Sequence, residues 1–236
     1  MSDAWDDVAE WWIDAVRDDP ANSDDFLALL EELLEDDSAD QRSDGLTLDV
    51  GCGEGQMMRR LGGTVIGTDV TAQLLRRAQA AGPTVRAALP DLSWARTNSF
   101  DRAICVGVVE AIADHRTLFH ELRRVTRRNG QLAVVSNHPV TTAPRSEAMV
   151  DPNGEVFWRW GDYLGSGQIH QKVGDDVVVL HHRSIGQLLS SAADAGWRLD
   201  RLIERGPSPA TLARHPDFGG QTNIPTLAGM RWTSTR

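Results

Sequence analysis

The stretch that decides the fold is Leu48-Asp49-Val50-Gly51-Cys52-Gly53-Glu54-Gly55. It closes an apolar run that begins at Gly45, places an acid near the end of that run, and then brings a glycine at every second position. A buried strand that ends in a Gly-rich turn and opens a helix has this pattern. Glycine lets the backbone turn tightly and approach a ligand closely, because it has no Cβ. We therefore expect Asp49 at the carboxyl end of a central strand, where open α/β sheets bind ligands.

Two classes of ligand use such a turn. The dinucleotide-binding fingerprint is G-x-G-x-x-G, and its third glycine would fall at Gln56. This departure weakens the pyrophosphate hypothesis, and a carboxylate at Asp49 suits a cationic ligand better than a pyrophosphate. An NAD(P)-dependent oxidoreductase stays open as an alternative at this point, as does a tight turn that holds no ligand.

The stretch resembles the first motif, roughly D-x-G-x-G-x-G, of the class I methyltransferases that use S-adenosylmethionine (AdoMet). Within that class it is similar to the small-molecule type, which includes the type 11 and ubiquinone-biosynthesis-like enzymes. The resemblance covers roughly residues 44–136 and is weaker over 137–236. It implies a three-layer, Rossmann-like α/β sheet of seven strands with the last strand antiparallel, and AdoMet as the cofactor with S-adenosylhomocysteine (AdoHcy) as the product. The cofactor contacts that it implies in this stretch are Asp49, Gly51, Cys52, Gly53 and Gly55.

A second strand is expected over 64–69, and it ends in Asp69, 20 residues beyond Asp49. A carboxylate at this point holds the ribose hydroxyls in nucleoside-binding sheets, although a helix-capping role is the alternative. In the resembling family an acid often contacts adenine where this chain has Ala88, so the adenine site departs from the pattern. The adenine contact is then expected from Asp91 or from the backbone at Leu89. The resemblance implies further cofactor contacts along the same edge at Val70 and Val106.

The remaining strands of the sheet are expected over 84–88, 102–106, 131–136, 197–203 and 227–232. Asp114 and Ser184 are expected to cap the helices that follow them. The Phe-Asp pair before the fourth strand and the pattern L-x-R-V-x-R-x-x-G before the fifth match the family. Where the family has L-E-H after the fourth strand, this chain has Ala111 in place of the histidine.

We expect two units along the chain. Residues 1–44 form a helical lid segment, with helices over 5–16 and 26–34, and residues 45–236 form the methyltransferase domain. A structured insertion over about 139–181 follows strand five, because a plain loop of that length is unusual. A strand is expected within it over 177–180, and residues 205–225 are expected to form a Pro/Gly-rich loop.

Methyl transfer is an in-line displacement in which the protein chiefly aligns the acceptor and excludes water, so the chemistry requires no fixed catalytic motif. A hydroxyl or amine acceptor also needs a base. His138 and His182 are the candidates for that role, and a local hydrogen-bonding role is the alternative for each. The candidates for contacts with the acceptor are Trp12, Trp158, Tyr163, His181 and Arg183, the last as an anion clamp.

Composition excludes several classes. The net charge is −10, and the first 40 residues carry fifteen acids and one arginine, which argues against nucleic acid as a partner at that end. The sequence contains no apolar run of about 18 residues, so we expect no membrane span. The acidic start does not resemble a secretory signal. Two isolated cysteines favour a reduced, cytoplasmic protein. No pair of aspartates lies near the expected fourth and fifth strands, so we expect no metal site.

The sequence therefore predicts an enzyme that transfers the methyl group of AdoMet to a small organic acceptor, with O-methylation favoured over N-methylation. A monomer or a homodimer is expected. Beside the oxidoreductase, a non-catalytic module that keeps the AdoMet fold is the second alternative.

Overall fold

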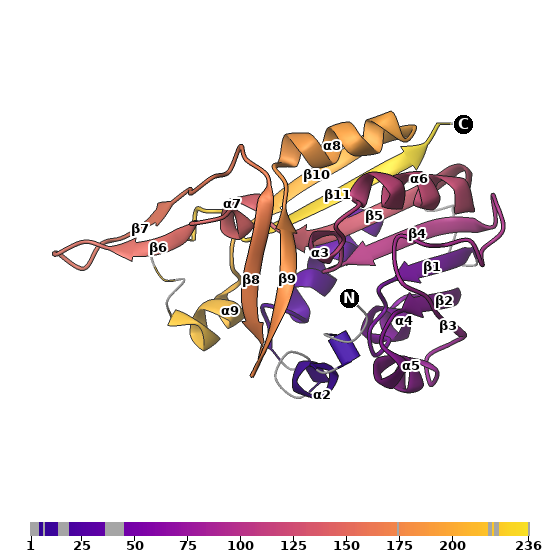
Figure 1. Cartoon of the computed structure of the whole chain (residues 1–236), viewed down its shortest axis with the longest axis horizontal. Helices are drawn as coiled ribbons and strands as arrows, with labels where there is room; N and C mark the ends of the chain where they lie inside the picture. Colours follow the sequence, from indigo (N-terminus) through magenta and orange to yellow (C-terminus); the bar gives the residue numbers. More distant parts are fainter. Residues whose placement is uncertain are drawn as a thin grey trace.

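The computed structural model describes residues 5–6, 8–13, 19–35, 45–173, 175–216, 219 and 222–235. Its centre is a seven-stranded sheet in the order β10-β11-β5-β4-β1-β2-β3 (Figure 1). Only β11 runs antiparallel to its neighbours, so the Rossmann-like sheet expected from the sequence is confirmed. The strands are β1 (Leu46–Val50), β2 (Thr64–Asp69), β3 (Thr84–Arg86), β4 (Phe100–Val106), β5 (Thr126–Asn137), β10 (Trp197–Arg205) and β11 (Leu227–Ser234).

Helices cover both faces of the sheet because its central strands are apolar on both sides. In β4, Ala103 and Cys105 face the layer of α6 and α8, whereas Ile104 between them faces α3. The two helices α4 and α5 follow the first two strands and pack on β2. The bounds are α3 (Asp24–Leu34), α4 (Gln56–Arg60), α5 (Ala72–Ala78), α6 (His115–Val125) and α8 (Ile185–Asp194).

Both expected helix caps are confirmed. The side chain of Asp114 accepts a hydrogen bond from the Thr117 amide at the start of α6, and Ser184 forms a capping box with Gln187 at the start of α8. The segment 205–225 is not only a loop, because it contains α9 (Pro209–Arg214). The buried carboxylate of Asp25 on α3 accepts a hydrogen bond from the Thr211 hydroxyl on α9 at 2.7 Å, and this bond joins the two helices.

The order of the strands places a switch point beside β1. The chain passes from β1 outward to β2 and β3, and then returns to the other side of β1 as β4. The connections after β1 and β4 therefore leave in opposite directions, which opens a crevice at the carboxyl edge of the sheet. The Gly-rich turn lies in this crevice.

The expected insertion is built from a short helix and two hairpins. The helix is α7 (Pro139–Thr142), and the hairpins pair β6 (Glu147–Val150) with β7 (Val156–Arg159) and β8 (Gly167–Val173) with β9 (Asp176–His182). The strand expected over 177–180 lies inside β9. Figure 1 shows β8 and β9 standing across the edge toward which the arrows of β1 and β4 point, while β6 and β7 project away from the body.

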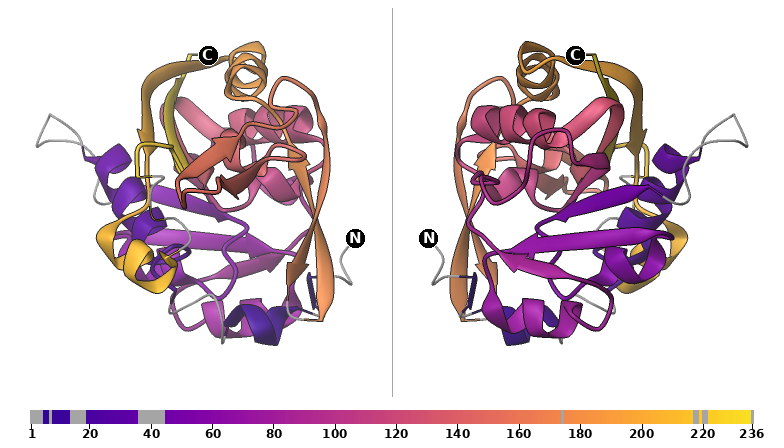
Figure 2. Two further views of the ribbon diagram at one scale, coloured as in Figure 1. Left: turned by 90° about the vertical axis from the view of Figure 1, so that its left-hand side faces the viewer. Right: turned by 90° about the vertical axis from the view of Figure 1, so that its right-hand side faces the viewer.

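The N-terminal segment divides into two parts with different positions. The first part includes α2 (Ala9–Trp11); there Val8 packs on Val173 and Val178 of the β8–β9 hairpin, and Ile13 packs on Leu74 of α5. In a view onto the carboxyl edge of the sheet, α2 lies below the ends of the strands. It sits between the β8–β9 hairpin and the helices α4 and α5, which follow β1 and β2 (Figure 2). The expected helix over 5–16 falls partly outside the described residues.

The second part, α3, is not a cover over the edge. It packs flat on the sheet, where its side chains meet β5 and β11. A Cβ on Gly229 of β11 would lie 2.8 Å from Leu29 Cγ, which shows how closely this helix approaches the strand. Among the described residues of this N-terminal segment, only those around α2 therefore lie where a lid is expected.

Candidate functional site

The Gly-rich turn is shaped by three glycines with positive φ. The φ angles are 71° at Gly51, 53° at Gly53 and 85° at Gly55, a region that L-residues with a Cβ rarely adopt. A Cβ on Gly51 would lie 2.3 Å from Val108 Cγ2, and one on Gly55 would lie 2.9 Å from Ala78 Cα, so these two glycines allow close packing. A Cβ on Gly53 would meet no atom within 4 Å in the described part of the chain. Gly53 therefore presents bare backbone to open space.

Asp49 is a buried carboxylate with an unused oxygen. It is 2% exposed, and its Oδ2 has no hydrogen-bond partner among the described residues. Burial, together with the negative charge of Asp69, raises the pKa of Asp49 to about 7. A buried charged group without a partner is costly, and a ligand that carries hydrogen-bond donors or positive charge would offset that cost.

Asp69 links the end of β2 to the Gly-rich turn. Its Oδ2 accepts a hydrogen bond from the Gly53 amide at 3.0 Å, and its Oδ1 accepts one from the Thr71 amide at 2.8 Å, just before α5. Burial raises the pKa of this carboxyl group. Asp69 is not the N-cap of α5, because that position is Thr71 and no side chain caps it. Each carboxylate oxygen of Asp69 keeps a second lone pair for a ligand hydroxyl.

The other expected cofactor positions lie in different surroundings. The Cys52 side chain turns under β2, where a Cβ on Gly67 would lie 2.6 Å from its Sγ, so only its backbone is available to a ligand. Asp91 is exposed, and its carboxylate accepts a hydrogen bond from the Ser93 amide at 2.8 Å. Three further positions are half-buried at or near the same edge: Val70, Leu89 and Val106.

Comparison with known proteins decides between the ligand classes. Residues 48–134 match the family model of a methyltransferase domain. The crystal structure of an S-adenosylmethionine-dependent methyltransferase from Mesorhizobium loti superposes with a TM-score of 0.73 and 25% identity, over 87% of this chain and 96% of that chain. This chain carries a class I AdoMet-dependent methyltransferase domain. AdoMet is the cofactor of that class, and the NAD(P) alternative is set aside.

Two sequence relatives extend the comparison. An uncharacterised protein of Mycobacterium tuberculosis is 32% identical over 183 residues, which are 68% of this chain and 65% of the relative. The match thus spans slightly less than two thirds of that relative's own length. A trans-aconitate 2-methyltransferase of an Azoarcus species is 36% identical over 93 residues, or 37% of each chain.

The residues of the methyltransferase site fit AdoMet. The cofactor carries a sulfonium and an ammonium, and the unused oxygen of Asp49 can receive a cationic donor group. The two oxygens of Asp69 can accept the vicinal ribose hydroxyls, and the open backbone face at Gly53 leaves room for close approach. When bound, AdoMet supplies an activated methyl group.

His138 does not offer a free ring nitrogen. The ring is 4% exposed, its Nδ1 accepts a hydrogen bond from the Val140 amide at 3.1 Å, and its Nε2 lies 2.8 Å from Glu204 Oε1. Since Nδ1 accepts, Nε2 carries the proton and donates to Glu204. These contacts cap α7 and join the end of β5 to β10, which corrects the expectation of a catalytic base at this position.

Arg183 is also engaged within the protein. Its guanidinium donates to the backbone oxygens of Val109, Ile112 and Ala113, at 3.2 Å for Val109 and 2.6 Å for Ala113. These residues belong to η2 (Val109–Ala111) and the turn after it. Burial lowers the pKa of Arg183 to about 10. Arg183 therefore clamps the loop after β4 and is not placed as an anion clamp.

We expect Arg183→Met to lower the free energy of unfolding by about 2–4 kcal/mol, because it leaves buried carbonyl oxygens without donors. Chemical denaturation measures the change. Arg116→Met is the matched control, since its side chain is 67% exposed and pairs only loosely with Asp194 at 3.6 Å; we expect a change below about 0.5 kcal/mol there. Equal stability of the two variants would contradict the clamp.

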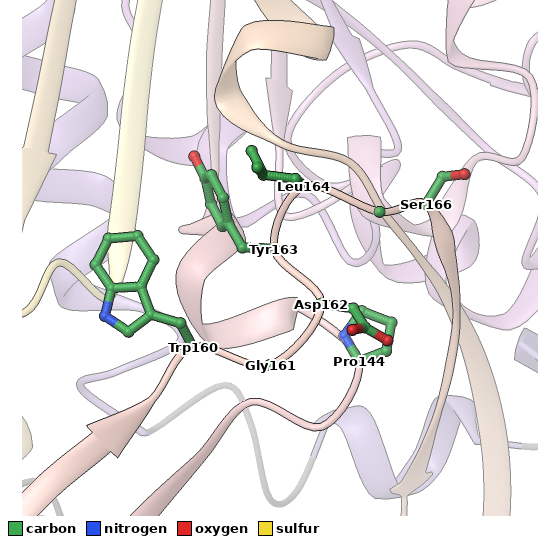
Figure 3. A pocket seen from close by; sticks show the side chains of 8 residues that line it. Pro144, Trp160, Gly161, Asp162, Tyr163, Leu164 and Ser166 are labelled. Carbon is green, nitrogen blue, oxygen red and sulfur yellow. The ribbon is translucent and has the colours of Figure 1, made fainter.

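The two aromatic candidates in the insertion, Trp158 and Tyr163, lie in different surroundings. The Trp158 indole donates to Ser146 Oγ at 2.7 Å and to Val140 O at 3.1 Å, so it fastens the β6–β7 hairpin to α7. Trp160 instead packs edge-on against Tyr163, with ring centroids 5.5 Å apart. Both line a shallow cavity of about 590 Å³, which is bounded by Pro144 and residues 160–166 (Figure 3).

His182 keeps one ring nitrogen free at the inner side of this loop. Its Nε2 lies 2.9 Å from the carbonyl oxygen of Tyr163, which can only accept, so Nε2 carries the proton. Its Nδ1 is buried with no partner among the described residues. Neighbouring His181 is half-buried, and burial lowers its pKa. Trp12, half-buried in the N-terminal segment, stacks edge-on with Trp5.

Glu110 is a further candidate site residue, which was not among those expected from the sequence. It lies on η2 after β4, is 7% exposed, and binds Asn137 at the end of β5. In the sequence, the signal for this residue is the acid of the L-E-H-like pattern, which directly precedes Ala111. In the described ranges, no three acids, histidines or cysteines gather as a metal site, and no helix is long and apolar enough to cross a membrane.

Proposed function

We propose that this protein transfers the methyl group of AdoMet to a small organic acceptor. The observation that carries the proposal is the pair of acids at the carboxyl edge, Asp49 with an unused buried oxygen and Asp69 hydrogen-bonded to the turn, around the exposed backbone of Gly53. In this arrangement Asp49 holds the cationic part of the cofactor, Asp69 holds the ribose, and the segment around α2 with the β8–β9 hairpin excludes water from the edge.

Oxygen is the favoured acceptor atom. A hydroxyl must lose its proton as it is methylated, which requires a proton acceptor nearby. His182 Nδ1 has no hydrogen-bond partner among the described residues, and it lies on the strand that stands across this edge, where it can bind the acceptor. Tyr163 and Trp160 form the aromatic part of the acceptor site in this proposal, at the cavity beside His182.

The direct test is transfer of label from methyl-labelled AdoMet in a cell extract that has been separated into small-molecule, protein and nucleic-acid fractions. We expect label in the small-molecule fraction, with one AdoHcy formed per methyl group transferred. Asp69→Ala is the negative control, because it removes the ribose contact. Label that accumulates in protein or nucleic acid would contradict the proposed acceptor class.

Cofactor affinity should depend on pH through Asp49. In the free protein its pKa is about 7, and an ammonium beside it lowers that value in the complex. Binding of AdoHcy therefore releases up to one proton below pH 7, and affinity rises up to about tenfold per pH unit until it levels near pH 7. Calorimetry in two buffers of different ionisation enthalpy measures the release. A pH-independent affinity, or release that persists in Asp49→Asn, would contradict this assignment.

A further inference from the structure

The carboxylate of Glu110 is held at one oxygen and free at the other. Oε1 accepts hydrogen bonds from the side-chain and backbone nitrogens of Asn137, at 2.9 and 3.3 Å. Oε2 is buried and has no partner in the part of the chain that the structure describes. Since the two donors of Asn137 fix the carboxylate in place, the lone pairs of Oε2 keep a set direction. An unpartnered carboxylate oxygen in a buried position requires a donor to offset its lost hydration.

Several contacts place Glu110 beside the cofactor turn. Val108, two residues earlier, lies directly on Gly51, where a Cβ would approach it to 2.3 Å. Asn137 ends β5 at the same edge of the sheet. Asp49 on β1 pairs with Ile104 of β4, and Glu110 lies on η2 just after β4 ends. Both carboxylates therefore lie near the carboxyl end of β4.

The charges around Glu110 leave Oε2 available. Arg183 is the nearby cation and acts on both Glu110 and Asp114 through space, but its N–H groups are directed to backbone carbonyls. The end of β9 packs against η2 and brings His182 to the same side. Burial raises the pKa of the Glu110 carboxyl group, so it takes up a proton more readily than an exposed glutamate.

We propose that Glu110 Oε2 faces the position of the transferred methyl group and binds the proton-bearing group of the acceptor, which is then a hydroxyl compound or an amine and not a polycarboxylate. The inference rests on the proposed methyl transfer. Oε2 accepts a hydrogen bond from the acceptor O–H or N–H. It takes that proton as the acceptor atom bonds to the methyl carbon and the carbon–sulfur bond breaks, leaving AdoHcy, the methylated product and a neutral Glu110 carboxyl group. A polycarboxylate would bring negative charge against Asp49 and Glu110.

The test needs no knowledge of the acceptor. Sinefungin is an AdoMet analogue in which an amine-bearing carbon replaces the methylated sulfonium. Sinefungin and AdoHcy share the amino-acid ammonium, so only sinefungin carries a positive group at the methyl position. Calorimetric titration of the wild-type protein should show tighter binding of sinefungin than of AdoHcy. Glu110→Gln should weaken sinefungin binding about tenfold or more and change AdoHcy binding less than about threefold.

The variant keeps its shape, because the glutamine amide oxygen still accepts from Asn137. The matched control is Asp114→Asn, which removes one charge from an exposed helix cap where asparagine serves equally well. It should leave the ratio of the two affinities unchanged.

Equal weakening of both ligands by Glu110→Gln would overturn the inference, because Glu110 would then support the cofactor or the fold in general. A wild-type protein that does not prefer sinefungin overturns it without any variant. If the wild-type protein binds neither ligand, the proposed function itself fails, and the inference fails with it.

Discussion

Gly51→Val should unfold or severely destabilise the protein, by more than about 3 kcal/mol. Its Cβ would lie 2.3 Å from Val108 Cγ2, and the backbone holds φ at 71°, a region that β-branched residues do not tolerate. Thermal denaturation of the ligand-free variant measures the effect.

Gly53→Ala is the matched comparison two residues along. Its φ of 53° is also positive, but its Cβ would enter open space in the described structure. We expect a stability loss of only about 1–2 kcal/mol from the backbone conformation. Affinity for AdoHcy should fall at least about tenfold, because the methyl group occupies space that the cofactor needs. If Gly53→Ala binds AdoHcy as tightly as the wild type, the cofactor does not approach this backbone.

Asp49→Asn should move stability and cofactor affinity in opposite directions. Desolvation by burial, with Asp69 nearby, raises the pKa of Asp49 from 3.8 to about 7. The folded state therefore loses stability as pH rises from 3.8 to about 7, and at pH 8 the full cost is about 4 kcal/mol. Asparagine removes the charge but keeps a buried polar group, so we expect a gain of about 1–2 kcal/mol in the free energy of unfolding at pH 8.

The same variant should bind AdoHcy at least about tenfold more weakly, since a neutral amide replaces the carboxylate opposite the ammonium. Denaturation at pH 5 and pH 8, together with calorimetry, measures both effects. A variant that is destabilised at pH 8 and retains its affinity would show that Asp49 serves the fold and not the cofactor.

The sheet and its cofactor edge are predictable from sequence because their determinants are local. The apolar runs before Asp49 and Asp69, the glycines between them and the capping residue Asp114 each act on their own few neighbours. The structure confirms these elements as β1, β2 and the start of α6.

The acceptor side is not predictable in the same way, because its side chains are satisfied by partners distant in sequence. His138 and Arg183 have residue types that suit catalysis, and only the fold shows that Glu204 and the carbonyl oxygens of η2 occupy them. Conversely, the carboxylate of Glu110 is oriented by a hydrogen bond from Asn137, 27 residues later, which the sequence does not reveal. The insertion shows the same dependence, since the Trp158 indole donates to the carbonyl oxygen of Val140 on α7, 18 residues earlier.

Calorimetric titration of the purified protein with AdoMet, AdoHcy and NAD tests the assignment of the cofactor site. We expect both adenosyl ligands to bind with one site per chain and NAD not to bind. We expect this result because the buried carboxylate of Asp49 favours the ammonium of the adenosyl ligands and repels the pyrophosphate of NAD. Binding of NAD, or failure of both adenosyl ligands to bind, would contradict the account and leave only the fold.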